Sequence, residues 1–210
     1  MTLNDELLAQ LGDSGLEQIA GMLGTDRDTA RDVVQAVSGT IIGGMAANAR
    51  HPDGAEALRS ALDDHVDTDP FNGDVASLTR DGHSILGHVL GGQGTEQAAA
   101  GLSQLAGIGP GTIMKVLALI APMIMSLLAE RAQKQSMDAV AVADDLDREQ
   151  SAMPGGLGDV LAALLGSIFG GVVPRQGGPY EPQGTTLPTE RALPPERSLP
   201  TERSTDVGGS

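Results

Sequence analysis

Large aromatic side chains are almost absent from this chain of 210 residues, and their absence narrows the folds that it can form. There is no tryptophan, and the only aromatic residues are Phe71, Phe169 and Tyr180. A hydrophobic core must therefore be built from leucine, isoleucine, valine, methionine and alanine. These side chains pack well between helices, whereas strands favour aromatic and β-branched residues. The composition therefore indicates an all-α protein.

Apolar residues recur at helical spacing over most of the first 135 residues. The predicted helices cover residues 3–11, 16–23, 26–49, 53–62, 83–90, 95–106 and 110–135. Gly12 is expected to separate the first two, and 63–82 is expected to be mostly loop with a short helix at 74–79. Pro122 is expected to kink the last helix, because proline cannot donate to the carbonyl four residues earlier.

Two segments share a pattern that indicates an internal duplication. Residues 15–21, Gly-Leu-Glu-Gln-Ile-Ala-Gly, are similar to residues 101–107, Gly-Leu-Ser-Gln-Leu-Ala-Gly. After a three-residue difference in the turn, the helices that follow align at an offset of 83 and keep the same apolar phase. We predict two copies of a short-helix, turn, long-helix unit. Chance similarity of two amphipathic helices is the alternative.

Composition divides the chain into four parts. We assign 1–135 to a helical domain, 136–154 to an acidic linker, 155–171 to an apolar helix with glycine-rich flanks, and 172–210 to a disordered proline-rich tail. The tail cannot bury enough apolar surface to offset the entropy cost of ordering. It repeats Leu-Pro-x-Glu-Arg three times with a period of six, which suits either a multivalent contact or a spacer.

The formal net charge of −15 limits the partners that we expect. Phosphate backbones and anionic lipids attract basic surfaces, so neither nucleic acid nor a membrane surface is an expected partner. The longest apolar run, 116–129, is shorter than the roughly 20 residues of a transmembrane helix, so we expect no transmembrane segment. The absence of cysteine and of a basic amino-terminal segment favours a cytoplasmic protein.

The sequence offers little for metal or catalytic chemistry. Without cysteine, disulfides, zinc thiolates and cysteine nucleophiles are excluded. His83 and His88 are five residues apart and do not share a helix face. A calcium-binding loop that starts at Asp67, in the acidic segment 63–69, would need glycine at its sixth position, where Asn72 stands. A solvated loop and divalent-ion binding are the two alternatives for this segment. No nucleophile elbow or phosphate-binding loop occurs. We predict no enzyme activity, no cofactor and no metal site, and we identify no small-molecule substrate.

Residues 16–35 are similar to a helix-turn-helix DNA-binding unit. In such units the second helix enters the major groove through its amino-terminal residues, which would make Arg27 and Arg31 the DNA contacts. Asp26, Asp28 and Asp32 alternate with these arginines and would face the phosphates. An ordinary corner between two helices needs the same small residues, so this is the alternative.

A family resemblance rests on residues 82–92, Gly-His-Ser-Ile-Leu-Gly-His-Val-Leu-Gly-Gly, together with Gly43-Gly44-Met45-Ala46 and Gly54-Ala55-Glu56-Ala57-Leu58. On these motifs the chain resembles the bacterial domain of unknown function 937, which is related to YidB-like proteins. The resemblance covers roughly 3–133. It implies a helical domain with a helix-turn-helix-like arrangement, and it implies no activity and no functional residues.

Together these observations favour a non-catalytic interaction or scaffolding protein that binds a protein partner or forms a homo-oligomer. The tail and the apolar helix are the expected contact regions. The candidate partner-binding residues in that helix are Leu157, Val160, Leu161, Leu164, Leu165, Ile168 and Phe169. A DNA-associated regulator that uses Arg27 and Arg31 is the alternative function.

Overall fold

The computed structural model describes residues 1–66, 70, 75–153 and 155–170, and over these ranges it is helical, with no strand. The helices are α1 (Leu3–Leu23), α2 (Arg27–Ala49), α3 (Pro52–Asp63), α4 (Val75–Val89), α5 (Gly92–Ala106), α6 (Pro110–Lys134), α7 (Ala139–Ser151) and α8 (Gly155–Phe169). The all-α prediction is confirmed for the described residues. The predicted disordered tail, 172–210, and its three repeats lie outside them.

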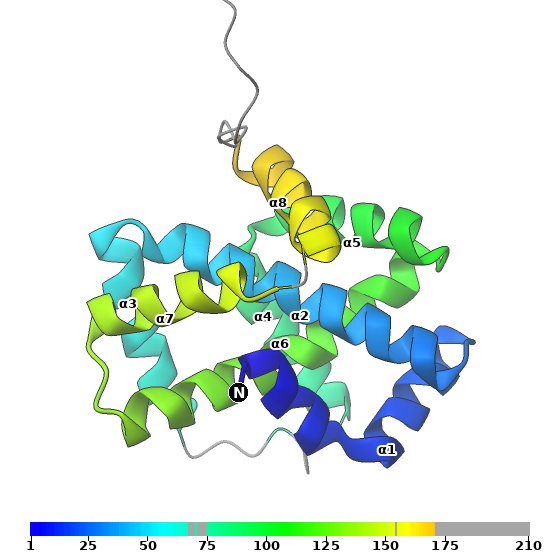
Figure 1. Ribbon diagram of the computed structural model, residues 1–210, viewed down its shortest axis with the longest axis horizontal. Helices are drawn as coiled ribbons and strands as arrows, with labels where there is room; N and C mark the ends of the chain where they lie inside the picture. Colours follow the sequence, from blue (N-terminus) through cyan, green and yellow to red (C-terminus); the bar gives the residue numbers. More distant parts are fainter. Residues whose placement is uncertain (67–69, 71–74, 154, 171–210) are drawn as a thin grey trace, which may run out of the picture. The chain divides into compact units, whose positions relative to one another are not determined.

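The long helices α2 and α6 run through the centre of the helical unit (Figure 1). Every residue of 36–46 in α2 and of 116–129 in α6 is buried. A helix that is apolar all round is buried rather than placed on a surface. Both helices have neighbours on several sides: α1, α4 and α5 pack against α6, while α3, α7 and α8 pack against α2.

Among the described residues, α6 is the one helix that is long and apolar enough to cross a membrane. In this structure 83% of its most apolar stretch is buried inside the fold. The other helices therefore cover its apolar surface, as is typical of a core helix.

The duplicated unit is visible, although its register differs from the one predicted. Gly24 ends α1 and Gly107 ends α5, both with a left-handed φ, of 69° and 68° respectively. The next helix begins three residues later in each copy, at Arg27 and at Pro110. The two turns therefore have equal length, and the offset of 83 holds from the turn through the long helix.

The similarity between 15–21 and 101–107 is therefore out of structural register. It pairs Ile19, which is 2% exposed, with Leu105, which is 51% exposed. At the offset of 83, Ile19 pairs with Leu102, also 2% exposed, and Leu105 pairs with Met22, 42% exposed. Burial decides between the two registers, because equivalent positions of a repeated unit face the same surroundings. The predicted three-residue difference in the turn was wrong.

The expected break between the first two short helices is a kink inside α1. Gly12 has φ 57° and ψ −170°, outside helical values, while helix continues on both sides. The first turn is capped by Thr2, whose side chain accepts from the backbone N of Asp5 at 3.1 Å while Asp5 accepts from the backbone N of Thr2.

α4 runs from Val75 to Val89 and joins two predicted helices, the short one at 74–79, of which 75–79 are described, and the one at 83–90. The prediction placed a helix boundary at Gly82, because glycine is often found at such boundaries. In the structure Gly82 lies inside α4 and against α6, where an added Cβ would overlap the carbonyl oxygen of Ala118. This glycine therefore serves the packing of two helix backbones and does not end a helix.

The carbonyl that Gly82 approaches is the one affected by Pro122. In an α-helix the N–H of each residue donates to the carbonyl four residues earlier, and Pro122 has no N–H to donate to Ala118. A glycine Cα–H near a carbonyl oxygen makes a weak favourable contact. Pro122 and Gly82 thus belong to one crossing of α4 over α6, although they lie on different helices.

Residues 139–151, assigned to an acidic linker, form α7. Its amino terminus is capped by Asp138, whose carboxylate accepts from the backbone N of Ala141 at 2.8 Å. Val142 and Leu146 are completely buried, and α7 packs against α2 and α3. The prediction placed these acidic residues in a linker, but Asp145 and Glu149 are buried beside Arg131.

Replacing Gly82 with alanine tests the α4–α6 crossing. We expect Gly82→Ala to lower the free energy of unfolding by about 1–3 kcal/mol, because backbone atoms of α6 occupy the space of the new methyl group. Gly87 is the matched control, since it lies on the same helix with nothing within 4 Å of an added Cβ. Gly87→Ala should be neutral or slightly stabilising. Urea unfolding measures both, and equal effects would contradict the assignment.

Candidate functional site

Helix α8 carries the predicted partner-binding residues and lies across α2 and α5 (Figure 1). Leu161 and Leu165 are 2% and 6% exposed. Three further candidates are half-buried, namely Leu157, Leu164 and Ile168. Val160 and Phe169 are exposed. The structure therefore directs one face of the apolar helix onto the protein's own surface and leaves another face open.

Four glycines on α2 and α5 form the groove that receives α8. On α2, an added Cβ at Gly39 would lie 2.6 Å from Cδ1 of Leu161, and one at Gly43 would overlap Cδ1 of Leu165. These distances are too short for a real Cβ, so the leucine side chains occupy the space that any other residue would fill.

The α5 side of the groove repeats this arrangement. An added Cβ at Gly101 would lie 2.5 Å from Cδ1 of Leu164, and one at Gly94 would lie 2.7 Å from Cγ2 of Ile168. Each of the four α8 side chains therefore has its own glycine. We call Gly39, Gly43, Gly94 and Gly101 the glycine groove.

The glycines are a cost to the helices that carry them. A glycine inside a helix is destabilising by about 0.5–1 kcal/mol relative to alanine, because it loses more backbone freedom on folding. Gly39 and Gly43 lie in the middle of α2, where no turn or positive φ requires glycine. Close seating of α8 is the physical gain that offsets this cost.

The groove contains backbone and aliphatic groups, so its chemistry is the binding of an apolar surface. Sequence reasoning missed it, although a signal was present. Gly39 and Gly43 are four residues apart and therefore lie on one helix face. Leu161, Leu164 and Leu165 followed by Ile168 have the matching spacing of i, i+3, i+4 and i+7.

The candidate DNA contacts lie at the exposed start of α2. Arg27 pairs with Asp13 at 3.3 Å, and Arg31 is exposed. Asp26 accepts from the backbone N of Thr29 at 2.9 Å, and this bond, with a second one from the Thr29 hydroxyl, holds the pKa of Asp26 below its usual value.

Most of α2 beyond its first turns is enclosed by other helices, whereas a recognition helix needs a free face. The DNA-contacting role of Arg27 and Arg31 stays a prediction.

Metal ligands are not gathered in the part of the chain that the structure describes, where no group of three or more histidine, aspartate or glutamate side chains could hold an ion. His65 Nδ1 lies 2.9 Å from the carbonyl oxygen of Ala61, and His88 Nδ1 lies 2.8 Å from that of Ser84. Residues 67–69 of the acidic segment 63–69 lie outside the described residues, so divalent-ion binding there stays a hypothesis.

A cluster of charges around Arg131 joins α1, α6 and α7. Its guanidinium donates to Glu149 at 2.7 Å, to Glu6 at 2.8 Å and to Asp145 at 3.1 Å. The other Glu149 oxygen accepts from the backbone N of Leu3 at 2.8 Å. Arg131, Asp145 and Glu149 are each no more than 10% exposed. One side chain of α6 thus holds the first and the seventh helix.

The environment of Arg131 favours the charged form of its guanidinium. Burial disfavours a charged guanidinium, but the hydrogen bonds that Arg131 donates to Glu149, Glu6 and Asp145 outweigh it and raise the pKa of Arg131. Arginine is already charged at every physiological pH, so the cluster supplies structure and not a proton. We assign it a structural role.

Replacing Arg131 tests this role. Arg131→Met should lower the free energy of unfolding by about 3 kcal/mol, because it leaves buried carboxylates without a counter-charge. Arg148 is the matched control: it pairs with Asp145 at 3.6 Å, but its side chain is 71% exposed. Arg148→Met should cost less than about 1 kcal/mol. Chemical denaturation measures both, and losses of similar size would refute the structural role.

A family model described as a bacterial protein of unknown function (DUF937) matches residues 5–131. No curated protein and no solved structure shows significant similarity to the chain. The matched region contains α2 through α5, nearly all of α1 and most of α6, with the four glycines of the groove. It ends before α7 and α8. The resemblance inferred from residues 82–92 is confirmed, and the chain belongs to this DUF937 family of bacterial proteins of unknown function.

Proposed function

We propose that this protein is a non-catalytic interaction protein that binds an apolar helix in its glycine groove, and that the partner helix is α8 of a second copy. The observation that carries the proposal is the one-to-one match between four glycines and four anchors. Helices that dock in grooves are recognised by anchors at i, i+3, i+4 and i+7, which is the spacing of 161, 164, 165 and 168.

The choice of α8 as occupant follows from the fit. A glycine groove excludes helices whose large side chains fall at other positions, because backbone atoms of α2 and α5 form its floor. α8 meets this requirement and carries a single charged residue, Asp159. Every copy of the chain offers both the groove and its occupant, so exchange of α8 would give a closed dimer with the same contacts.

The connection between α7 and α8 determines how this exchange would depend on concentration. α7 ends at Ser151 and α8 begins at Gly155, so within one copy α8 is held close to its own groove. A tethered helix has a high effective concentration, which favours the monomer in dilute solution. We therefore propose a monomer that can exchange its α8 with a second copy and that dimerises as its local concentration rises.

The proposal retains the expectations of a cytoplasmic protein without enzyme activity, and it leaves the tail as a second candidate contact region. If α8 exchanges, two tails are brought together, and the three Leu-Pro-x-Glu-Arg copies of each would act jointly.

Complementation of two full-length variants tests the exchange. Gly43→Leu blocks the groove but leaves the anchors of α8 intact, whereas Leu161→Asp combined with Leu165→Asp disables α8 but leaves the groove open. Each variant alone should be monomeric. When the two are mixed, with one labelled with ¹⁵N, we expect a one-to-one heterodimer by native mass spectrometry, because the free α8 of the first variant enters the open groove of the second.

Val160→Asp is the matched control, because Val160 lies on α8 but is 44% exposed. This variant keeps α8 in its own groove and should form much less heterodimer with Gly43→Leu. If Gly43→Leu fails to fold, Gly101→Leu blocks the same groove from α5. Folded variants that form no heterodimer would refute the exchange.

A further inference from the structure

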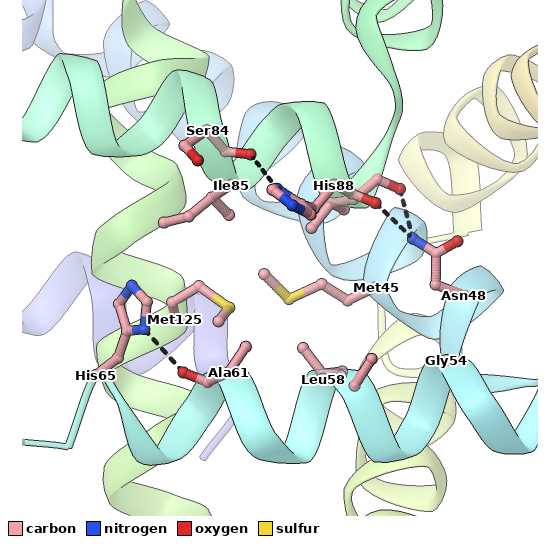
Figure 2. A pocket seen from close by; sticks show the side chains of 12 residues that line it. Met45, Asn48, Gly54, Leu58, Ala61, His65, Ser84, Ile85, His88 and Met125 are labelled. Atoms are coloured by element: carbon pink, nitrogen blue, oxygen red, sulfur yellow. Dashed lines mark hydrogen bonds between the residues drawn. The ribbon is translucent and has the colours of Figure 1, made fainter.

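A cavity lies between α3 and α4, with residues of α2 and α6 also lining it (Figure 2). Its volume is about 450 Å³, within the range of about 300–1,000 Å³ that is common for small-molecule sites. Such sites are mostly apolar and contain few, well-placed polar groups. The lining of this cavity is likewise mostly apolar with a few polar groups. Neither the family description nor the glycine groove assigns a role to it.

The apolar part of the cavity centres on two methionines. Figure 2 shows Met45 of α2 and Met125 of α6 side by side between the helices, with Leu58 and Ala61 on the α3 side and Ile85 on the α4 side. Methionine is flexible and polarisable, so it adapts to ligands of irregular shape. These five residues would hold the hydrocarbon part of a ligand.

The walls of the cavity are fixed by hydrogen bonds. The side-chain amide of Asn48 donates to the carbonyl oxygen of Val89 at 2.7 Å and ties the end of α4 to α2. The Arg59 side chain donates from Nε to the carbonyl oxygen of Met137 at 2.9 Å and ties α3 to the segment after α6. A cavity between pinned helices is ready to bind with little loss of conformational freedom.

Four polar side chains line the cavity, Asn48, His65, Ser84 and His88, and the two imidazoles among them lie on opposite walls. His65 projects from the end of α3 and is half-buried, while His88 lies on α4 (Figure 2). His65 Nδ1 faces the carbonyl oxygen of Ala61 in α3, and His88 Nδ1 faces that of Ser84 in α4, at 2.8–2.9 Å. A carbonyl only accepts, so Nδ1 carries the hydrogen, and in a neutral ring Nε2 then has a free lone pair.

The charge around the cavity selects the head group of the ligand. The described residues that line it include no carboxylate, lysine or arginine. The whole chain has a formal net charge of −15, which disfavours an anionic ligand. A lone pair on Nε2 requires a hydrogen-bond donor. A neutral hydroxyl group meets both conditions.

We propose that the cavity between α3 and α4 binds a small apolar alcohol, with the hydrocarbon chain against Met45 and Met125 and the hydroxyl group donating to Nε2 of His65. His65 is assigned the hydroxyl group because it is the less exposed imidazole, and a hydrogen bond shielded from water contributes more to affinity. The site is separate from the glycine groove, so the proposal of alcohol binding does not depend on α8 exchange.

Methionine methyl NMR of the full-length protein tests the site. With ¹³C-methyl methionine, 1-octanol should shift the signals of Met45 and Met125 saturably and leave Met22, which lines a different surface, unchanged. Heptyl methyl ether is an isomer of octanol without a donor and should bind roughly 3–10-fold more weakly, the loss of one hydrogen bond. Octanoate should also bind more weakly than octanol, because of its charge.

Three variants complete the test. His65→Phe should bring octanol and the ether to equal affinity, while His83→Phe, an exposed histidine of α4 outside the cavity, should leave the difference unchanged. Ala61→Leu fills the cavity and should abolish the shifts even if His65→Phe does not fold. Equal binding of octanol and the ether to the unmodified protein, tighter binding of octanoate, or parallel shifts at Met22 would overturn the proposal.

Discussion

Close approach of helix backbones, made possible by glycine, is the constraint on which this structure depends. A core whose described residues include no aromatic ring fills space by bringing helices together rather than by inserting large side chains. Gly82 lets α4 rest on the backbone of α6, and Gly44 lets the end of α4 rest on α2, where an added Cβ would lie 2.6 Å from Leu90 and 2.8 Å from Val89. The groove for α8 applies the same principle at the surface.

Those parts of the fold that depend on local chemistry were predicted well. The bounds of α2 and α6 follow from caps and prolines next to each helix, and prediction and structure differ there by one residue at most. α4 and α7 were predicted incorrectly because their local sequence, a glycine in α4 and acidic residues in α7, is typical of helix boundaries and linkers. Gly82 looks like a helix boundary until α6 is known to lie against it, and Glu149 looks solvated until Arg131 is known to lie beside it.

Of the glycine groove and its occupant α8, only the occupant could be predicted from the sequence. The anchors of α8 stand out as an isolated apolar segment, and the structure adds which of them point inward. The receiving surface could not be assigned from sequence, because Gly39 and Gly101 become neighbours of one helix only through folding. The α3–α4 cavity could not be predicted either, since His65 follows α3, His88 lies in α4, and the two methionines lie in α2 and α6.

The hydrogen bond from the backbone N of Leu3 to Glu149 joins positions 146 residues apart. A ribosome adds residues at roughly 5–20 per second, so the carboxylate that satisfies the first turn of α1 is synthesised roughly 7–29 seconds after Leu3. Arg131 is itself added only 18 residues before Glu149, so through most of that interval Glu6 also lacks its partner. The nascent chain therefore cannot complete the contacts of α1 until α7 has left the exit tunnel, which couples the order of synthesis to the order of assembly.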